Sequence, residues 1–510
     1  MARLPVPGGD EGQWGDVLNQ YLLTSHANDG TLRPSAIASK ADDAAVVHIA
    51  GNETVSGIKT FTFSPILPAP VSAADAVRKD YVDTVVAAAK SYSPATIVVA
   101  PVGSATKADY YTDGISDDVQ IQAAINSLPA AGGKILLKQG TYNISAPIIV
   151  SLAKGFVLEG EGWTTVLFAV DGLNGNIITF NPTSSGIWCR IAHLKIDHNG
   201  ANQTAGNGIF AKGAIQCVFD SLWFTRPWGN GVHLFQDGNG GTGHHNRFIG
   251  CLFDNGNVTN GGDGRALRLE ASDENMVVNC DFESNGRHGA TEPNHIYDRS
   301  GLQHIVGSVF VGGETGVKLE GSYSRVIGCM FDSQSNHAIR LNGGGNIISS
   351  NTIYKPGINI VSPTYDGVWV DNISNAVIAN NVFLSDSTGT RSGVNFANGS
   401  TNCLCEGNMF LTQGSGYGTS AVIVGTGNVV VNNRGFNSQG TAAIVVTASP
   451  FTYTTGATAE VVYVSGGTVS SIVKNGITLF SQSNVSIALS PNSSIIVTYS
   501  VPPTMNKDRQ

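Results

Sequence analysis

The sequence has little charge, few cysteines and no long apolar run. Asp, Glu, Lys and Arg make up only 13% of the 510 residues, whereas about a quarter is usual for a soluble domain. The formal net charge is −9 and no run of Lys and Arg is present, which argues against a nucleic-acid partner. No apolar stretch approaches the roughly 18 residues of a membrane span, so we expect no insertion into a membrane.

The seven cysteines are odd in number and form no CxxC pair. Such a set suits neither a disulfide framework nor a zinc site, so we expect buried thiols, no cofactor and no metal. The tandem His244-His245 lies in a glycine-rich stretch, which we interpret as a turn rather than a metal site. Residues 1–16 lack the apolar core of a secretory signal. We therefore expect synthesis in the cytoplasm without a signal peptide.

Glycine is abundant, with 62 residues, about twice its average share. From about residue 186 a short motif recurs every 21 to 30 residues. One position of the motif holds Ser, Cys or Asn: Ser221, Cys251, Cys280, Ser308, Cys329, Asn351, Asn381 and Asn408. The position two residues on is aromatic or Ile: Trp223, Phe253, Phe282, Phe310, Phe331, Ile353, Phe383 and Phe410. A fixed motif with variable spacers predicts a solenoid whose loops differ in length.

Each unit carries a second segment that alternates with period two, as in TGVKLE (315–320). This alternation predicts strands, and stacking them from unit to unit predicts long parallel sheets. With Val317 and Leu319 inward, the outward column is Phe210, His233, Arg268, Tyr297, Lys318, Arg340, Trp369, Asn395 and Ile423. The column two residues later is Lys212, Phe235, Glu270, Arg299, Glu320, Asn342, Asp371 and Ala397.

The segment DYYTDGISDDVQIQAAINSLPAAGGKILLKQGTYNIS (109–145) resembles the opening signature of the pectin-lyase-like superfamily. Within it, Ser116 is placed to cap a helix whose apolar face contains Ile121, Ile125 and Leu128. The resemblance implies an all-β chain in which residues 96–440 form a right-handed parallel β-helix. The helix would then cap the open end of this solenoid.

Both ends of the chain depart from the repeat. Residues 48–70 predict short strands, and residues 72–91 predict a helix with an apolar seam. The combination GNETVSGIKTFTFSPILPAP … AADAVRKDYVD resembles bacteriophage tail-fibre and tailspike proteins. It implies a virion tail protein, with residues 1–40 attaching to a phage baseplate or tail protein and residues 41–95 supporting a homotrimer. A flexible linker is the alternative for residues 1–92.

Residues 441–505 contain β-rich runs separated by the turn signals SGG and KNG. These signals predict a small C-terminal β-sandwich. A terminal cap, a trimerisation domain and a carbohydrate-binding module all fit this segment. The final residues MNKDRQ are expected to be frayed.

An apolar column supports the trimer. With the Phe column inward, the outward residues beside it are Leu222, Leu252, Asp281, Val309, Met330, Thr352, Val382 and Met409. Six of these eight are apolar, which is unusual for a solvated strand face. Either a neighbouring β-helix or long loops of the same chain would cover them.

The first outward column suits a sugar chain that bears carboxylates. Aromatic rings pack on apolar sugar faces, and Arg binds carboxylates bidentately. The candidate substrate-binding residues are His233, Arg268, Tyr297, Lys318, Arg340 and Trp369. The alternative is an ordinary solvated face with ion pairs between rungs, such as Arg299 between Glu270 and Glu320.

Cleavage of a glycan by hydrolysis needs two carboxyl groups. The candidates are Glu270, Glu320, Asp371 and Asp298. Glu270 and Glu320 are two rungs apart, which is roughly 10 Å at the backbone and close to the spacing of an inverting pair. A lyase would instead use an Arg or Lys base, for which Arg268, Lys318 and Arg340 are candidates.

The sequence thus favours a virion tail fibre or tailspike that binds a host cell-surface polysaccharide and depolymerises it. A non-enzymatic receptor-binding or structural tail-fibre protein stays open. So does a free polysaccharide lyase or hydrolase, since fold alone does not decide between cleavage and binding.

Overall fold

The computed structural model describes two units of the chain. The described residues are 4, 6–33, 96–151, 155–180, 186–235, 243–254, 264–284, 294–358, 362–385, 388–397, 399–412, 416–436, 441–456 and 459–509. The units are residues 1–89 and 90–510. In the first, helix α1 (Trp14–Leu22) has no buried residue, and the strands and helix predicted over 48–91 lie outside the described residues. No helix in the described ranges is long and apolar enough to cross a membrane.

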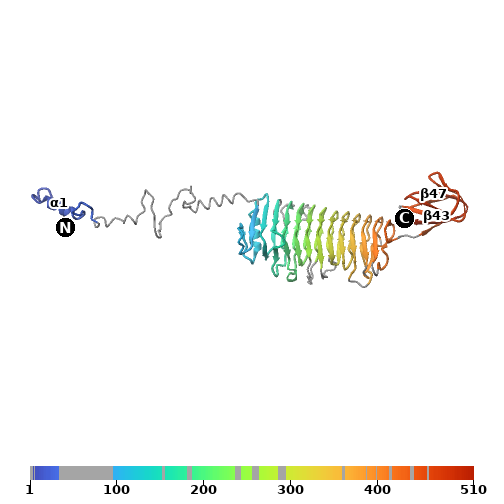
Figure 1. Cartoon of the computed structure of the whole chain (residues 1–510), viewed down its shortest axis with the longest axis horizontal. Coiled ribbons are helices and arrows are strands. Elements are labelled where there is room, and N and C mark those ends of the chain that lie inside the picture. The colour runs from blue at the N-terminus through green and yellow to red at the C-terminus, as the bar shows by residue number, and fades with distance from the viewer. Residues whose placement is uncertain are drawn as a thin grey trace. The chain divides into compact units, whose positions relative to one another are not determined.

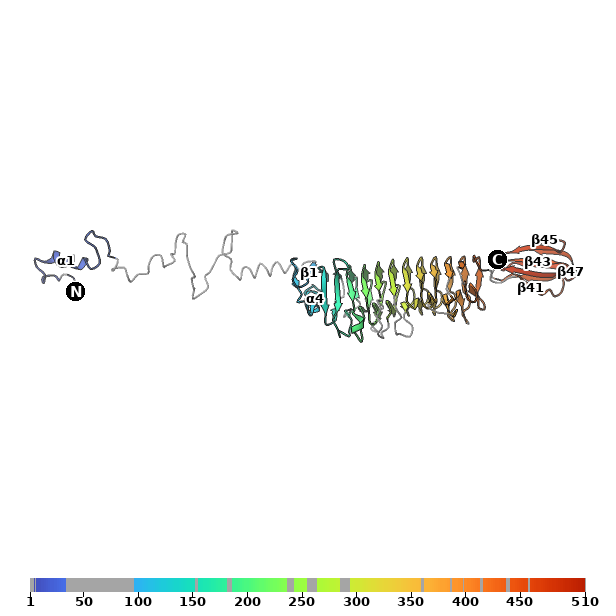
Figure 2. The same cartoon turned by 60° about the horizontal axis from the view of Figure 1, so that its bottom comes forward.

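The second unit contains a right-handed parallel β-helix, as predicted (Figures 1 and 2). Its described residues form four parallel sheets, which we call I to IV. Eleven coils of the described chain contribute a strand to sheet I, then to sheet II, then to sheet III, and four of them also contribute one to sheet IV. Three further strands extend sheet I at its two ends. Strands far apart in sequence therefore lie side by side.

The strands pair in the following order within each sheet. Sheet I contains β2 (Tyr110–Tyr111), β1 (Thr96–Ala100), β3 (Gly133–Leu137), β6 (Phe156–Glu159), β10 (Arg190–Ala192), β14 (Val218–Asp220), β18 (Arg247–Ile249), β22 (Met276–Val278), β25 (His304–Val306), β28 (Arg325–Ile327), β31 (Ile347–Ser349), β34 (Val377–Ala379), β37 (Leu404–Glu406) and β40 (Val429–Val431). Sheet II contains β4 (Gly140–Ile144), β7 (Thr165–Ala169), β11 (Lys195–Asp197), β15 (Trp223–Thr225), β19 (Leu252–Asp254), β23 (Asp281–Ser284), β26 (Val309–Gly312), β29 (Met330–Asp332), β32 (Thr352–Tyr354), β35 (Val382–Ser385) and β38 (Met409–Thr412). Sheet III contains β5 (Ile148–Val150), β8 (Ile178–Phe180), β12 (Ile209–Lys212), β16 (Val232–Phe235), β20 (Leu267–Glu270), β24 (Asn294–Asp298), β27 (Thr315–Leu319), β30 (Ile339–Leu341), β33 (Tyr365–Val370), β36 (Thr390–Phe396) and β39 (Val422–Ile423). Sheet IV contains β9 (Gly186–Ile187), β13 (Ala214–Ile215), β17 (Gly243–His244) and β21 (Ser272–Asp273), and a 3-10 helix, η2, spans Gly200–Asn202.

Aromatic rings stack face to face from rung to rung inside the β-helix. From Phe224 to Phe331 the ring centroids of successive members are 4.6 to 4.8 Å apart, and the rings lie within 7° of parallel. In the rung of β15 the predicted aromatic column is wrong by one residue, because Phe224 and not Trp223 enters the stack. Leu222 is buried there and Trp223 pairs with Leu252 in the outward column. Two adjacent aromatic residues both fit the motif, and a slip of one residue exchanges the faces of a strand.

A polar ladder runs beside this stack, at the motif position that holds Ser, Cys or Asn. The side-chain oxygen of Asn381 accepts hydrogen bonds from the backbone N–H and the amide of Asn351, both at 2.9 Å. Asn408 accepts the same pair of bonds from Asn381. The residue before each interior position is left-handed, with φ of 57° at Gly250 and 51° at Asn279. Because Gly and Asn tolerate this conformation best, they recur there in the motif.

All seven cysteines fall within the described residues, and each is a free, buried thiol. The prediction of core thiols is therefore confirmed. Cys251 and Cys280, for example, each follow a residue with positive φ and occupy the interior position of their rung. The recurrence of cysteine therefore reflects packing inside the β-helix.

Helix α4 (Asp117–Asn126) packs against the first strands of the β-helix. Ile121, Ile125 and Leu128 are buried, as predicted. Ser116 makes no capping hydrogen bond from its side chain, contrary to the prediction. Instead Asp117 accepts bonds of 2.7 Å from the backbone N–H groups of Gly114 and Asn143, which tie the helix to β4.

Residues 441–509 form a separate β-sandwich of two antiparallel sheets in the described part of that range. One contains β41 (Thr441–Ile444), β48 (Thr504–Arg509), β43 (Glu460–Ser465) and β46 (Val485–Leu489). The other contains β42 (Phe451–Thr454), β47 (Ser494–Val501), β44 (Thr468–Lys474) and β45 (Ile477–Phe480). Val462, Ile472 and Val497 are buried in the shared core. The frayed C-terminus was a wrong prediction, because β48 pairs on both sides, with β41 and β43.

Candidate functional site

The outward side chains of sheet III form one continuous row across consecutive strands. Each residue of the row pairs in register with the next. The row consists of Phe210, His233, Arg268, Tyr297, Lys318, Arg340 and Trp369, and we call it the basic–aromatic row. The six residues predicted to bind substrate therefore occupy one register position, as the period-two alternation predicts.

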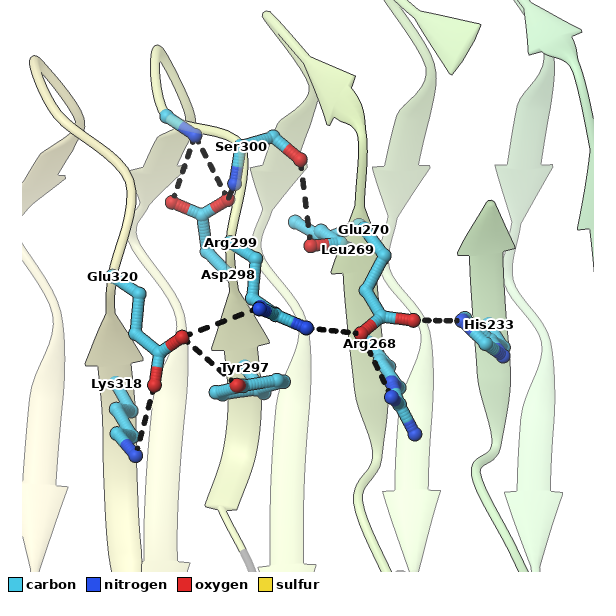
Figure 3. Close-up of polar contacts among 11 residues, drawn as sticks. His233, Arg268, Leu269, Glu270, Tyr297, Asp298, Arg299, Ser300, Lys318 and Glu320 are labelled. Atoms are coloured by element: carbon cyan, nitrogen blue, oxygen red, sulfur yellow. Dashed lines mark hydrogen bonds and ion pairs between the residues drawn. The ribbon is translucent and has the colours of Figure 1, made fainter. Parts of the chain in front are cut away.

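Glu270 lies at the end of β20 and joins two strands of the row (Figure 3). Its Oε2 is 2.9 Å from Nε2 of His233, and its Oε1 is 2.7 Å from Nη2 of Arg268. The side chains of His233 and Glu270 are each only 13% exposed. The carboxylate is thus held from two directions by groups of the basic–aromatic row.

Arg299 bridges the two predicted carboxylates, as Figure 3 shows. Its guanidinium is 3.3 Å from Oε1 of Glu270 and 3.4 Å from Oε2 of Glu320. Glu320 also accepts a hydrogen bond of 2.9 Å from the Tyr297 hydroxyl and pairs with Lys318 Nζ at 3.1 Å. The ion pairs of Arg299 with Glu270 and Glu320 that the sequence predicts are therefore present, and both a ligand-binding face and an ordinary solvated face can carry them. Arg299 is the most exposed member of this network, at 55%.

Asp371 is placed beside Arg340 and Trp369, farther along the same face. Nη2 of Arg340 is 3.0 Å from Oδ2 of Asp371, and the amide of Asn342 donates to the same oxygen at 2.8 Å. The Arg340 guanidinium also lies 4.3 Å from the centre of the Trp369 ring. His337 stacks on Trp369 with a centroid distance of 4.7 Å. The indole is therefore held by two neighbours.

Asp298 does not join the outward network. It pairs in register with Leu269 and Leu319, two interior residues, and is fully buried. Its carboxylate accepts hydrogen bonds from the backbone N–H groups of Ser300 and Gly301 (Figure 3). The prediction of Asp298 as one of the carboxyl groups of the outward face is therefore wrong, because the residue after an outward Tyr297 must face inward.

The surroundings of the titratable side chains on and below this face shift their pKa values in different directions. Burial disfavours the charged form of Glu270, but the bonds from Arg268 and His233 outweigh it and lower its pKa to about 2. Burial raises the pKa of Asp298, against the opposing effect of its hydrogen bonds. Burial and the bond to Glu320 raise the pKa of Tyr297. Burial lowers the pKa of His337 to about 4, so its imidazole is neutral at pH 7.

One supporting cluster was missed by sequence reasoning. Asp366 is fully buried and accepts hydrogen bonds from Arg391, Ser392 and Asn395 of the next rung. His337 accepts a bond of 3.1 Å from the backbone N–H of Asp366. The cluster orients the imidazole that stacks on Trp369. In the sequence, this cluster is indicated only by Asp366 before a glycine at the start of a strand. The same Asp-Gly pair is common in turns, so it does not identify a buried cluster.

This arrangement has two chemical capabilities. Arg268, Arg299 and Lys318 present donors that bind carboxylates. Glu270 is ionised at neutral pH, so it can act as a base, a nucleophile or a hydrogen-bond acceptor, whereas a general acid needs a raised pKa. Hydrolysis by Glu270 and Glu320 also requires Arg299 to leave the space between them.

The chain is similar to known proteins in part of its sequence and in its fold. Residues 255–471, less than half of the chain, match the family described as periplasmic copper-binding protein (NosD). No curated protein matches the sequence. Phage tailspike proteins recur among the similar solved structures.

Three solved structures illustrate this similarity. The A-module of mannuronan C-5 epimerase AlgE4 of Azotobacter vinelandii is 15% identical, with 63% of this chain and 92% of that chain covered and a TM-score of 0.48. The tailspike gp49 of Acinetobacter baumannii bacteriophage Fri1, a capsular polysaccharide depolymerase, is 11% identical, with 82% and 86% covered and a TM-score of 0.44. A tailspike of E. coli bacteriophage HK620 in complex with a pentasaccharide is 12% identical, with 79% and 91% covered and a TM-score of 0.45. At these identities and TM-scores no activity is transferred to this chain.

The low pKa of Glu270 predicts a pH-dependent contribution to stability. Because its pKa falls from 4.5 to about 2 on folding, its ion pairs stabilise the protein fully above the unfolded value and lose this effect as the pH falls through about 2. We expect Glu270→Gln to lower the free energy of unfolding at pH 7, and the difference from the parent to shrink steadily below about pH 4.5. Urea unfolding at a series of pH values measures this difference.

The control is Glu406→Gln, which changes an exposed carboxylate on the outer face of sheet I. It should follow the parent at every pH. A Glu270→Gln difference that is independent of pH down to about 2 would contradict the ion-pair assignment.

Proposed function

We propose that this chain is a tail fibre or tailspike of a virion, and that its β-helix binds an acidic polysaccharide of the host cell surface. The observation that carries the proposal is the basic–aromatic row, in which cationic and aromatic side chains interleave at one register position of sheet III. A linear sugar chain presents rings and carboxylates at regular intervals. A row of this kind offers matching contacts at each strand.

The ion pairs of the face favour a ligand that itself carries carboxylates. Arg268, Lys318 and Arg340 each have an acidic partner already, so a neutral sugar would gain little by contacting them. A carboxylate of the ligand can share or replace these partners without leaving a cation unpaired. Arg299, which is 55% exposed, is the most accessible of the guanidiniums in the Glu270–Glu320 network.

Cleavage of the bound glycan is the second candidate function. Glu270 and Glu320 contact one guanidinium from two sides, so a movement of Arg299 onto the ligand opens the space between them. They sit two strands apart, about 10 Å at the backbone, near the separation of about 6.5–9.5 Å for inverting hydrolysis. Glu270, which is ionised at neutral pH, would take the part of the base, and Glu320 would be the second carboxyl group of the pair. An eliminative cleavage would use Arg268, Lys318 or Arg340 as the base.

The proposed virion role includes attachment through residues 1–40 and assembly as a homotrimer. Two apolar columns flank the left-handed turn between sheets I and II. One contains Ile249, Val278, Val306 and Ile327, and the other contains Leu252, Val309 and Met330. Such a corner is suited to packing against a second copy of the chain.

The binding proposal predicts selectivity on an array of bacterial surface polysaccharides. We expect the protein to bind glycans that contain uronic acids and not neutral ones, with affinity that falls as salt is added. Lys318→Gln and Arg340→Gln should each weaken binding about tenfold, the value of a lost charged hydrogen bond. Arg325→Gln is the matched control, since Arg325 is an exposed cation on the outer face of sheet I.

Binding confined to neutral glycans, or an equal loss in Arg325→Gln, would overturn the proposal. The same incubations report on cleavage through new reducing ends and unsaturated products. Hydrolysis that Glu320→Gln abolishes would establish the depolymerase, whereas binding without new chain ends would leave a receptor-binding protein.

The trimer proposal predicts the mass in solution. Light scattering should give three times the chain mass of 53.2 kDa. Val306→Glu and Val309→Glu place charges at the apolar corner and should shift the mass towards that of one chain. Ile496→Glu, at an exposed position of the β-sandwich, serves as control. A parent protein with the mass of one chain would contradict the trimer.

A further inference from the structure

A cluster of metal-binding side chains lies at the corner between sheets IV and I. His244 ends β17, and Glu274 follows β21 on the next rung. Between each of these strands and sheet I the chain makes a left-handed turn, with φ of 57° at His245 and 53° at Glu274. His245 and Glu274 thus occupy equivalent positions on adjacent rungs, and their side chains meet on the outside of the β-helix.

The ligand atoms of the cluster are close together. One side-chain nitrogen of each histidine and one carboxylate oxygen of Glu274 lie within 4.8 Å of one another. Nε2 of His245 is 2.7 Å from Oε2 of Glu274, and the two imidazole centroids are 4.7 Å apart. In a tetrahedral site with bonds of about 2.0–2.1 Å, ligand atoms lie about 3.3 Å apart. Small side-chain rotations therefore suffice to surround one ion.

We propose that His244, His245 and Glu274 form a binding site for a divalent first-row transition ion such as Zn²⁺. Two imidazoles and one carboxylate are a donor set that suits this class of ion and that alkaline-earth ions do not prefer. Three protein ligands leave one coordination position open to water or to an incoming anion. The site differs in residues and in place from the Glu270–Glu320 network.

Charged side chains near the three ligands both favour and oppose the binding of a cation. Asp273 pairs in register with His244 and adds a second carboxylate to the corner. Arg247 lines a cavity of about 350 Å³ beside His245, together with Trp188, Gln216 and Val218, and its charge opposes a cation. The indole N–H of Trp188 donates to Oε1 of Gln216 at 2.5 Å. The corner thus combines the carboxylates of Glu274 and Asp273 with the guanidinium of Arg247.

A bound ion would connect two rungs of the β-helix. The histidines belong to one coil and Glu274 to the next, 29 residues later. A ligand that binds only the folded chain stabilises it in proportion to its affinity and concentration. By contrast, the bare contact between His245 and Glu274, with side chains 49% and 45% exposed, is open to solvent and stabilises the fold little. The ion is therefore expected to raise the melting temperature visibly.

Titration calorimetry of the full chain with Zn²⁺ tests the proposal. We expect one equivalent of Zn²⁺ per chain in the parent protein, and loss of this equivalent in His244→Ala, His245→Ala and the double variant. Glu274→Gln should weaken binding, because the amide is a poorer ligand than the carboxylate. The matched control is His304→Ala, which removes a partly exposed outward histidine of sheet I and should leave the equivalent in place.

Two further measurements separate this site from other histidines of the chain. Co²⁺ bound to the parent should give the visible absorption bands of a low-coordinate site, and His245→Ala should abolish them. Zn²⁺ should raise the melting temperature of the parent and of His304→Ala, but not that of His245→Ala. Zn²⁺ binding that is absent from the parent, or that persists unchanged in the double variant, would overturn the proposal. No polysaccharide is used, so the outcome is independent of the proposed function.

Discussion

The structure depends on the in-register stacking of its rungs. Each position of one coil sits on the equivalent position of the next, one strand spacing of about 4.8 Å away. The Phe224-to-Phe331 stack and the Asn351–Asn381–Asn408 ladder maintain this register from inside, because a slip of one residue would bury the outward residues and expose the rings. Loops of different length between the strands leave the register unchanged, as the variable spacing of the motif requires.

Because the interior residues of successive rungs are in register, the outward side chains of these rungs also line up in rows. In sheet III, residues that are 21 to 35 positions apart in sequence become neighbours, as for Tyr297 with Lys318 and His233 with Arg268. A site can therefore be assembled from one or two side chains per rung. The network around Arg299 is built in this way, with Glu270 from one rung and Glu320 from another. The same stacking brings His245 to Glu274 at a turn. Such a surface is extended rather than pocket-like, and this is the shape that the proposed linear glycan requires.

Period-two alternation made most of the site predictable from sequence. It placed Arg268, Tyr297 and Lys318 in one row, and the pairing in sheet III agrees. The same rule places Asp298 inside, so its assignment to the outward carboxylates was an avoidable error. The choice between Trp223 and Phe224 was not decidable, because both satisfy the motif. Contacts that cross rungs at turns, such as His245 with Glu274, depend on left-handed residues and variable loop lengths, which alternation does not encode.

Hydroxyl-radical footprinting with a bound uronate polysaccharide tests the central claim most directly. The account predicts slower oxidation of Phe235 and Trp369, which lie on the face of sheet III, when the glycan is present. Tyr323 and Trp163 are exposed elsewhere and should be oxidised at the same rate with and without it. Protection of Tyr323, or of the β-sandwich, with Phe235 and Trp369 unchanged would contradict the account and place the glycan on another surface.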